Sequence, residues 1–399
     1  MLSHPLKRVL NAAQTQGINT FLSGYTDAGT LPHLVAMAGT SHHTIYQGAF
    51  GSCDISNPAP MTTDTVIQLA SVTKIFTAIA ALQLVERGQL DLDAPISDYC
   101  PDARKLVVLD GWSDNSDPLT HAPSTPITAR HLMTHTSGLS YEFWNADILR
   151  YMEAKGIPSL GTLSRDCLFT PLIADPGETW EYGISFDWLG QVIEAIAGQD
   201  IESYMAENLF APMGMKRTVF TLTPDLTSRM AAIHVRNAEG ALESTDIIGE
   251  QNGDFKEGGG GLSSTSEDVM RFIRMVLNKG AVDGGRILSP ESVSLLTQNA
   301  TGKLPLKRLE TTNAEASLDF EFFPGFRKSW TLGMMRNETA APTGRSAGSC
   351  GWGGLFNTYY WIDPERDIGG ILSTQLLPFA DETSLEAFYG FETRIYDAV

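Results

Sequence analysis

The stretch DTVIQLASVTKIFTAIAALQLVERGQL, residues 64–90, predicts the helix around which the rest of the chain is organised. The helix is expected to begin at about Ser71, to run to about Arg87 and to end at Gly88, because glycine commonly terminates helices. Its residues are apolar almost all round the helix axis. That pattern is typical of a helix buried at the centre of a protein.

Ser71 and Lys74 stand at positions i and i+3 of this helix, which places both side chains on one face. Ser71 lies at the N-terminus, where unpaired N–H groups and the helix dipole stabilise negative charge. A lysine in a dry site loses its preference for the charged form and can take part in proton transfer. Ser-x-x-Lys is a weak pattern that arises by chance, but an unpaired lysine on so buried a helix would be costly. The position therefore favours a catalytic pair.

Alternating and amphipathic patterns at both ends of the chain predict strands and helices there. Between residues 92 and 235 the sequence instead indicates short helices and polar loops. We expect an α/β (α+β) domain built from both termini, residues 1–91 and 236–399, and a mainly helical domain inserted at 92–235, with the active site between them. The expected strands are 33–40, 43–51, 330–335, 356–364 and 368–375, and the expected helices near the termini are 1–17, 266–280 and 384–399.

Composition argues against two classes of partner. The 399 residues include 28 basic and 47 acidic side chains, which gives a formal net charge of −19 at pH 7. A polyanion repels nucleic acid and anionic membrane surfaces. No apolar run approaches the roughly 20 residues that a membrane-spanning helix needs, and the N-terminal residues lack the pattern of a secretory signal. We expect no nucleic-acid partner and no membrane span.

The four cysteines show no paired or CxxC spacing, so disulfides and structural zinc are not expected. His131 and His135 are four residues apart, but Leu132 stands where a zinc protease would have its glutamate. The sequence therefore predicts a cytoplasmic protein without a metal or other cofactor.

A second serine, Ser346, lies in the pentapeptide GRSAG, residues 344–348, which has the Gly-x-Ser-x-Gly form of a nucleophile elbow. That elbow requires a histidine later in the chain. All eight histidines precede Ser346, and the glycine-rich residues after it do not readily begin a helix. We interpret GRSAG as a loop that enters a strand, not as the catalytic site.

Two other features are candidates for the chemistry. Tyr182 follows a Pro-Gly turn in WEYGISFDW, residues 180–188, where half-buried packing is the ordinary alternative. Gly353 and Gly354 enter a predicted strand in CGWGGLFNTYYWIDP, residues 350–364. A glycine pair there lets a substrate approach the backbone, although a β-bulge would use glycine in the same way.

As an ordered set, these motifs resemble the serine hydrolases of the class C β-lactamase and penicillin-binding-protein type, most closely the family VIII carboxylesterases. The order is SVTK, then HTSGL at 135–139, the tyrosine loop, GGGGLSST at 258–265, and the late glycine pair. The chain is also similar to acyltransferases of the lovastatin-acyltransferase type, through ALQLVERGQLDLD, ITARHLMTHTSGLSY, WEYG and WIDP. The resemblance runs from about residue 60 to 375. It implies a β-lactamase-like fold, with a central antiparallel sheet flanked by helices.

The resemblance also implies roles for particular residues. Ser71 would be the acyl-forming nucleophile, and Tyr182 the general base, as a phenolate stabilised by Lys74. The backbone N–H groups of Ser71 and Leu355 would form the oxyanion hole. The strand residues Trp352, Gly353 and Gly354 would border the substrate, and residues 143–152 would line the acyl pocket.

Two departures from the β-lactamase pattern bear on the substrate. Trp352-Gly353-Gly354 replaces a Lys-Thr-Gly whose lysine helps to hold a carboxylate, and Ile184 replaces an asparagine that would bond a polar acylamide. Losing a charge-assisted hydrogen bond costs roughly 1.5–3 kcal/mol. Both changes favour neutral, fairly apolar esters. Arg345, however, is near enough in sequence to Trp352 to act as a substitute cation, so weak β-lactam hydrolysis stays open as an alternative.

The function expected from the sequence is therefore a serine carboxylesterase (EC 3.1.1 type) for small-molecule esters with short to medium acyl chains. The alternatives are an acyltransferase, in which an alcohol replaces water, and a weak β-lactamase or D-amino-acid peptidase. A non-catalytic penicillin-binding or sensor module is a rival of another class, and the intact Ser71, Lys74 and Tyr182 count against it. The sequence specifies neither the physiological ester nor the oligomeric state.

Overall fold

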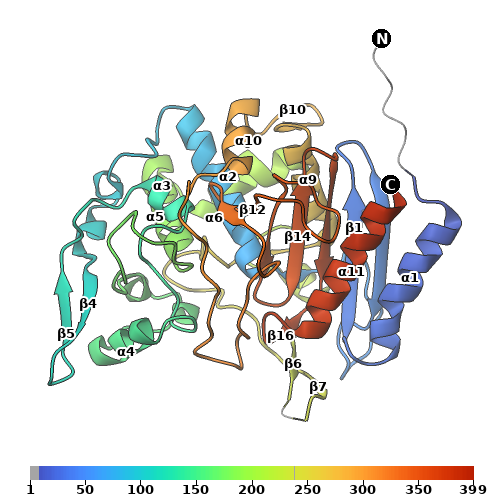
Figure 1. The fold of residues 1–399 in the computed structure, drawn as a ribbon, viewed down its shortest axis with the longest axis horizontal. Helices are drawn as coiled ribbons and strands as arrows, with labels where there is room; N and C mark the ends of the chain where they lie inside the picture. The colour runs from blue at the N-terminus through green and yellow to red at the C-terminus, as the bar shows by residue number, and fades with distance from the viewer. Residues whose placement is uncertain (1–8, 238) are drawn as a thin grey trace.

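The computed structural model describes residues 9–237 and 239–399. A seven-stranded antiparallel sheet forms its centre, with the strand order β11-β12-β13-β14-β15-β1-β2 (Figure 1). The expected central antiparallel sheet flanked by helices is thus confirmed. Its strands are β1 (His33–Gly39), β2 (Thr44–Gly51), β11 (Lys328–Trp330), β12 (Met335–Asn337), β13 (Cys350–Gly354), β14 (Thr358–Asp363) and β15 (Ile368–Ser373).

Helices cover both faces of this sheet, and the side chains of β14 show which helix lies on which face. Tyr359 packs on Phe388 of α11, whereas the next residue, Tyr360, points to the other face and packs on Phe272 of α9. Helix α1 lies beside α11 (Figure 1). The helices are α1 (Ala12–Asp27), α2 (Thr73–Glu86), α3 (Ala129–Met133), α4 (Ala146–Lys155), α5 (Ser185–Ala197), α6 (Ile201–Met205), α7 (Ala211–Met213), α8 (Pro224–Thr227), α9 (Ser266–Leu277), α10 (Pro290–Thr297) and α11 (Glu382–Ala398).

The remaining strands form small ladders outside the main sheet. They are β3 (Ile67–Gln68) with β8 (Ser263–Ser264), β4 (Val108–Trp112) with β5 (Pro118–His121), β16 (Leu376–Leu377) with β6 (His234–Arg236) and β7 (Leu242–Ser244), and β9 (Ala281–Val282) with β10 (Gly285–Arg286). The β4–β5 hairpin was not expected within residues 92–235. The β3–β8 ladder ties the residues just before α2 to the GGGGLSST segment.

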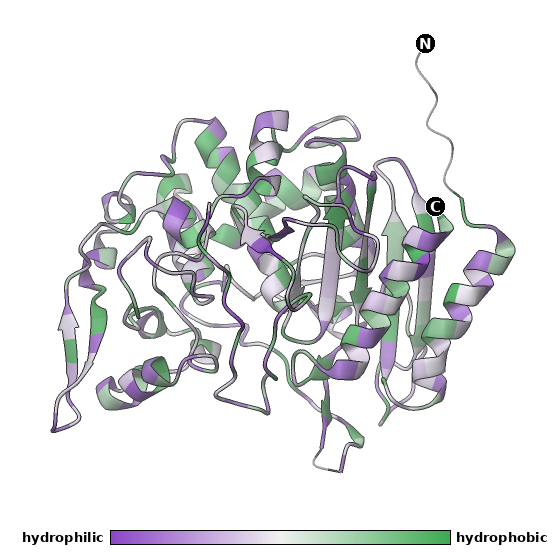
Figure 2. Ribbon diagram, in the orientation of Figure 1, coloured by the Kyte–Doolittle hydropathy of each residue, from purple (hydrophilic) through white to green (hydrophobic). Residues whose placement is uncertain are grey.

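Helix α2 is the buried helix that the sequence predicts. Every residue from Thr73 to Leu84 is buried, and the helix packs against α5 and α6. Figure 2 shows hydrophobic residues gathered in the interior elements, while α1 and α11 mix hydrophobic and hydrophilic residues along their length. Within the described part of the chain, no helix is both long and apolar enough to cross a membrane.

Two expectations about individual segments need correction. Residues 331–334 of the predicted strand 330–335 form a turn between β11 and β12, closed by a hydrogen bond from Thr331 N to Met334 O (2.8 Å), and Gly333 adopts a φ of +153° within it. The first helix begins at Ala12, and Val9, an apolar residue of the expected amphipathic helix 1–17, is 62% exposed. The part of that expected helix at residues 1–8 lies outside the described residues.

Candidate active site

Ser71 and Lys74 meet where the chain turns into α2. Ser71 lies in a 3-10 turn, Ala70–Val72, that leads directly into the helix. Ala70 there has a φ of +44°, a left-handed conformation that costs a residue with a side chain some strain. Lys74 is 1% exposed, and its Nζ donates a hydrogen bond to Ser71 Oγ over 3.1 Å. The expectation that the two side chains share one face is confirmed.

Lys74 has two further hydrogen bonds. Its Nζ also donates to Tyr141 Oη over 2.9 Å and to the carbonyl oxygen of Gly259 over 2.8 Å. An ammonium group has three protons, so these contacts account for all its donors. Lys74 is therefore held in one position, with one of its three protons directed at Ser71.

Tyr182 lies beside this pair and is almost fully buried. Its ring centroid is 4.8 Å from Lys74 Nζ, and its hydroxyl accepts a hydrogen bond from Trp352 Nε1 over 2.8 Å. No hydrogen bond between Lys74 and the Tyr182 hydroxyl occurs among the described residues, so the ammonium faces the ring rather than the oxygen. His135 holds the loop, because its Nδ1 accepts from Gly183 N (3.5 Å) and its ring packs on that of Tyr182.

Tyr141 and Asp187 are site residues that sequence reasoning missed. Tyr141 lies in a loop, so only the tertiary structure places its hydroxyl on Lys74. Asp187 lies on α5, fully buried, and its Oδ1 accepts from Gly259 N over 2.9 Å while Oδ2 has no partner. A signal for Asp187 was present, since a carboxylate inside the apolar helix SFDWLGQVIEAIA has to be paired or neutralised.

Strand β13 brings the glycine pair to the turn that carries Ser71. A Cβ at Gly354 would collide with the carbonyl oxygen of Leu69, so glycine is needed for this close packing. Leu355 follows the strand, and its N–H donates to no other described residue. This geometry leaves the Leu355 N–H available beside the nucleophile turn, as an oxyanion hole requires.

These residues open onto a cavity of about 400 Å³. Ser71, Tyr141, Tyr182 and Leu355 line it together with Trp352 and Gly353. Of the segment 143–152, Phe143 and Trp144 line the cavity, while the buried residues of α4 do not. Ile184 and Gly354 are not among its lining residues: Ile184 is buried at the start of α5.

Carboxyl groups dominate the electrostatics around Lys74. Burial raises the pKa of Asp187 to about 6, although Lys74 opposes the shift. Burial and the charge of Asp187 raise the pKa of Glu257, which also lines the cavity, to about 8. Burial, and secondarily Lys74, holds the pKa of His135 well below its usual value. Near neutral pH His135 is therefore uncharged and acts as a hydrogen-bond acceptor.

The GRSAG loop lies away from this cavity. Gly344 and Gly348 have φ values of +106° and +88°, and Ser346 N donates to Asp363 Oδ2 over 2.8 Å. Arg345 was expected to offer a substitute cation, and this is wrong. Its guanidinium is 1% exposed and donates twice to the Glu392 carboxylate of α11, so it has no access to a substrate.

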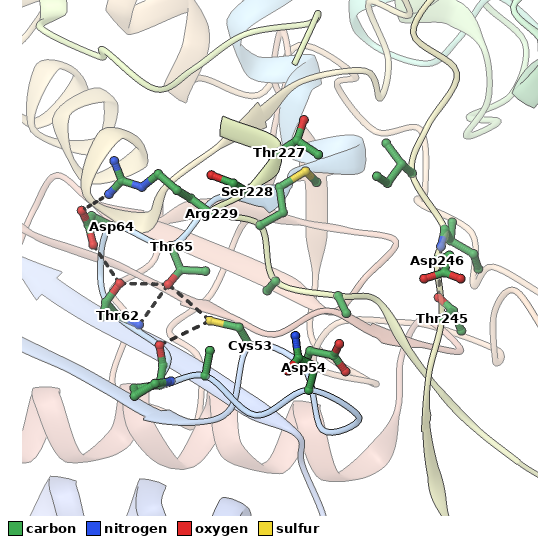
Figure 3. Close-up of a pocket in the computed structure, with 18 residues that line it drawn as sticks. Cys53, Asp54, Thr62, Asp64, Thr65, Thr227, Ser228, Arg229, Thr245 and Asp246 are labelled. Carbon is green, nitrogen blue, oxygen red and sulfur yellow. Dashed lines mark hydrogen bonds and ion pairs between the residues drawn. The ribbon is translucent and has the colours of Figure 1, made fainter. Parts of the chain in front are cut away.

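A second pocket, of about 490 Å³, contains none of the predicted site residues. Figure 3 shows that its polar side chains bond to one another: Thr62 contacts Asp64 and Thr65, Arg229 contacts Asp64, and Thr65 contacts Cys53. Residues 245–248 line this pocket, whereas residues 249–251 line the cavity at Ser71. The segment 245–251 therefore borders both the second pocket and the cavity at Ser71.

Comparison with known proteins identifies the family. The beta-lactamase family model matches residues 18–393. Monacolin J acid methylbutanoyltransferase from Aspergillus terreus is 33% identical over 350 residues, which cover 84% of this chain and 83% of that protein. A lovastatin esterase from Penicillium rubens is 30% identical over 396 residues, covering 95% of this chain and 98% of that protein.

A solved structure supports the same conclusion. A mutant of simvastatin synthase from Aspergillus terreus superimposes with a TM-score of 0.85 at 30% identity, covering 97% of this chain and 95% of that one. The family model spans most of the chain, and these relatives include both acyltransferases and an esterase. The chain belongs to the beta-lactamase family and is a serine-hydrolase-type enzyme of its acyltransferase and esterase group.

Proposed function

We propose that this enzyme is a serine carboxylesterase that hydrolyses short- to medium-chain esters through an acyl-enzyme on Ser71. The observation that carries the proposal is the hydrogen bond from Lys74 Nζ to Ser71 Oγ at a cavity of about 400 Å³. A serine becomes a useful nucleophile when a neighbouring group manages its proton. Ser71 has such neighbours, and Ser346 does not.

In the first step, Ser71 Oγ forms a bond to the ester carbonyl carbon and gives up its proton. We propose that this proton passes to Tyr182 acting as a phenolate, a role that Lys74, 4.8 Å from the ring centroid, and the Trp352 N–H would support. The N–H groups of Ser71 and Leu355 stabilise the oxyanion, at about 2.7–4 kcal/mol for each such donor. Collapse of the tetrahedral intermediate breaks the bond to the alcohol, which leaves with the proton from Tyr182.

In the second step, water attacks the acyl-enzyme, the carboxylic acid leaves and Ser71 regains its proton. An acyltransferase differs only here, because an alcohol takes the place of water. This second candidate is favoured by the names of the relatives, which include the methylbutanoyltransferase. The two activities therefore share Ser71, Lys74 and Tyr182 and differ in the acceptor.

The cavity supports an apolar acyl group. Phe143, Trp144, Trp352 and Phe379 supply aromatic surface, and among its described lining residues there is no lysine, arginine or histidine. The carboxylate of a β-lactam would have no cationic partner there, and the buried Arg345 cannot supply one.

The organisation of the chain fits this proposal. We infer two domains, residues 1–91 with 236–399 and residues 92–235, with the site between them. Ser71 and Trp352 come from the first, whereas Tyr141 and Tyr182 come from the second, and all four line one cavity. The four cysteines are unpaired, which suits the reducing cytoplasm that we propose as its location.

The test is to trap the intermediate. Wild-type protein is mixed with p-nitrophenyl butyrate and quenched in acid. The protein is then digested, and the masses of its peptides are measured by mass spectrometry. We expect release of p-nitrophenol and a butyryl group on the peptide that contains Ser71. A butyryl group on the Ser346 peptide, or no release, would contradict the proposal. Repeating the reaction with an added primary alcohol separates the two candidates, since an acyltransferase forms the new ester in preference to the acid.

A further inference from the structure

Glu257 is a carboxyl that lines the cavity and that the proposed reaction does not use. It immediately precedes the glycine run 258–261, and its carboxyl folds over that run, since a Cβ at Gly260 would collide with Glu257 Oε1. The side chain is partly buried and lines the same cavity as Ser71. Among the residues that the structure describes, none hydrogen-bonds to this carboxyl or forms an ion pair with it. A structural carboxyl at this depth would have such partners.

The charges around Glu257 are mostly of its own sign. Asp187 and Glu142 act on it as neighbouring acids, and Lys74 is the only cation among its electrostatic partners. Lys74 already donates its three protons in hydrogen bonds to Ser71, Tyr141 and a backbone carbonyl. Among the described residues, therefore, no further cation is available to pair with the Glu257 carboxylate.

Two other acids extend the negative surface of the cavity, and both differ from Glu257 in having partners. Glu142 accepts from Ser159 Oγ over 3.2 Å, and Glu250 accepts from Asn252 N over 2.7 Å. Both line the cavity as well. Of these three carboxyls that line the cavity, Glu257 is thus the one that no described residue hydrogen-bonds.

We propose that Glu257 selects esters that carry a positively charged nitrogen, and that the enzyme accepts such substrates in preference to carboxylate-bearing ones. The inference rests on the proposed esterase function and adds the charge class of its substrate. An ammonium group in the cavity would place its charge against Glu257, where the attraction is only weakly screened. The relatives named for acting on monacolin J acid or the ML-236A carboxylate use substrates of the opposite charge.

The test uses pairs of esters that differ in charge and not in shape. One pair carries the charge on the acyl side, p-nitrophenyl 4-(trimethylammonio)butyrate against p-nitrophenyl 5,5-dimethylhexanoate. The other carries it on the alcohol side, butyrylcholine against 3,3-dimethylbutyl butyrate. In at least one pair we expect the ratio of kcat/KM, cationic over neutral, to exceed about tenfold in the wild type when it is measured above pH 8, where the Glu257 carboxyl carries its charge. A ratio near one in both pairs overturns the proposal, while failure to hydrolyse any of the four esters overturns the esterase function instead.

The variant Glu257→Gln keeps the shape and removes the charge. Its ratio should fall to near one, whereas Glu250→Gln, whose carboxyl is exposed, should change the ratio by less than about twofold because solvent screens it. An equal fall in both variants would mean that overall charge, not Glu257, sets the preference, and would overturn the assignment.

The pH dependence gives a separate readout in the wild type. Burial and the nearby Asp187 raise the pKa of Glu257 to about 8, with Lys74 opposing and Glu142 adding to the shift. A carboxyl gains its negative charge above its pKa, so the ratio should rise as the pH passes 8 and should stay flat there in Glu257→Gln. Because the neutral ester shares the other ionisable groups, their effect on the chemistry cancels in the ratio.

Binding can be measured without turnover. Choline and its neutral isostere 3,3-dimethylbutanol are titrated into folded wild type and Glu257→Gln by calorimetry above pH 8, where the Glu257 carboxyl carries its charge. We expect the cation to bind the wild type at least about tenfold more tightly than it binds the variant. Equal binding to both proteins would overturn the proposal even if no ester were hydrolysed.

Discussion

Ser71 and Ser346 both lie in short motifs that serine hydrolases use, but their surroundings differ. Ser71 accepts a hydrogen bond from Lys74 and lines a cavity with two tyrosines. Ser346 lies in a turn, where its N–H is bonded to Asp363 and the adjacent Arg345 is paired with Glu392. The first serine has a proton partner and space for a substrate, and the second has neither.

The charged groups explain the difference. At Ser71 one cation, Lys74, is shared among a serine, a tyrosine and a backbone carbonyl, and the nearby Asp187 keeps one oxygen without a partner. Near Ser346 the Arg345 guanidinium donates twice to the Glu392 carboxylate, which also accepts from Thr343 Oγ1. A buried group of charges that keeps an unpaired hydrogen-bonding atom is suited to catalysis. An ion pair whose two partners bond to each other is suited to holding two structural elements together. The following substitutions test that contrast.

Replacement of the two serines should give the largest difference. In Ser71→Ala we expect hydrolysis of p-nitrophenyl butyrate to fall by at least about 10³-fold, because the acyl-enzyme cannot form. Ser346→Ala should retain wild-type turnover to within about twofold, since a partly exposed loop hydroxyl touches no reacting group. Steady-state kinetics on both variants measure this. An active Ser71→Ala beside an inactive, folded Ser346→Ala would reverse the comparison.

Tyr182→Phe should have the next largest effect. Removing the hydroxyl takes away the proposed base, and general-base contributions are typically about 10²–10⁴-fold. The fall should be in kcat rather than in KM, since the ring and its packing remain. Tyr141→Phe is the matched control: it removes the other tyrosine hydroxyl, leaves two of the three Lys74 hydrogen bonds, and should cost only about tenfold. A larger loss in Tyr141→Phe than in Tyr182→Phe would transfer the role of base to Tyr141.

The sequence allowed the central helix and the Ser71–Lys74 contact to be predicted because both depend on local helical periodicity, whereas Gly353 and Gly354, expected to enter the strand 356–364, end the separate strand β13. A spacing of three residues on a helix defines a contact without knowledge of the fold. The turn at 331–334 was mistaken for strand because its residues are as apolar as those of β11 and β12. Pattern alone does not distinguish a buried turn from a buried strand.

Contacts between segments far apart in sequence could not be predicted in the same way. Tyr141 reaches Lys74 across 67 positions, and Arg345 reaches Glu392 across 47. Arg345 was assigned to the substrate because it is close in sequence to Trp352, yet its side chain points to α11. Proximity in sequence does not determine where a side chain points, since Arg345 lies in the loop before β13 and that loop directs it to α11.

Arg345→Met should lower stability without lowering activity. Removing one partner of a buried ion pair leaves Glu392 charged and unpaired, which costs about 3 kcal/mol or more. We expect urea unfolding to report that loss, and ester turnover per folded molecule to be unchanged because Arg345 does not line the cavity. The double variant Arg345→Met/Glu392→Met should recover most of the stability. If Arg345→Met instead abolished turnover while remaining folded, the loop would belong to the active site.

Trp352→Phe should have the smallest effect and the most specific one. The substitution removes the N–H that donates to the Tyr182 hydroxyl and should lower kcat/KM by about tenfold, the value of one hydrogen bond to a charged group. The fall should be in kcat rather than in KM, because the substitution acts on the proposed base. Trp330→Phe is the control, since it removes a neighbouring indole N–H that donates to Met133 O over 3.1 Å and makes no bond to Tyr182. An equal fall in both variants would mean that the aromatic packing matters, and a fall in Trp352→Phe alone would assign the effect to the hydrogen bond.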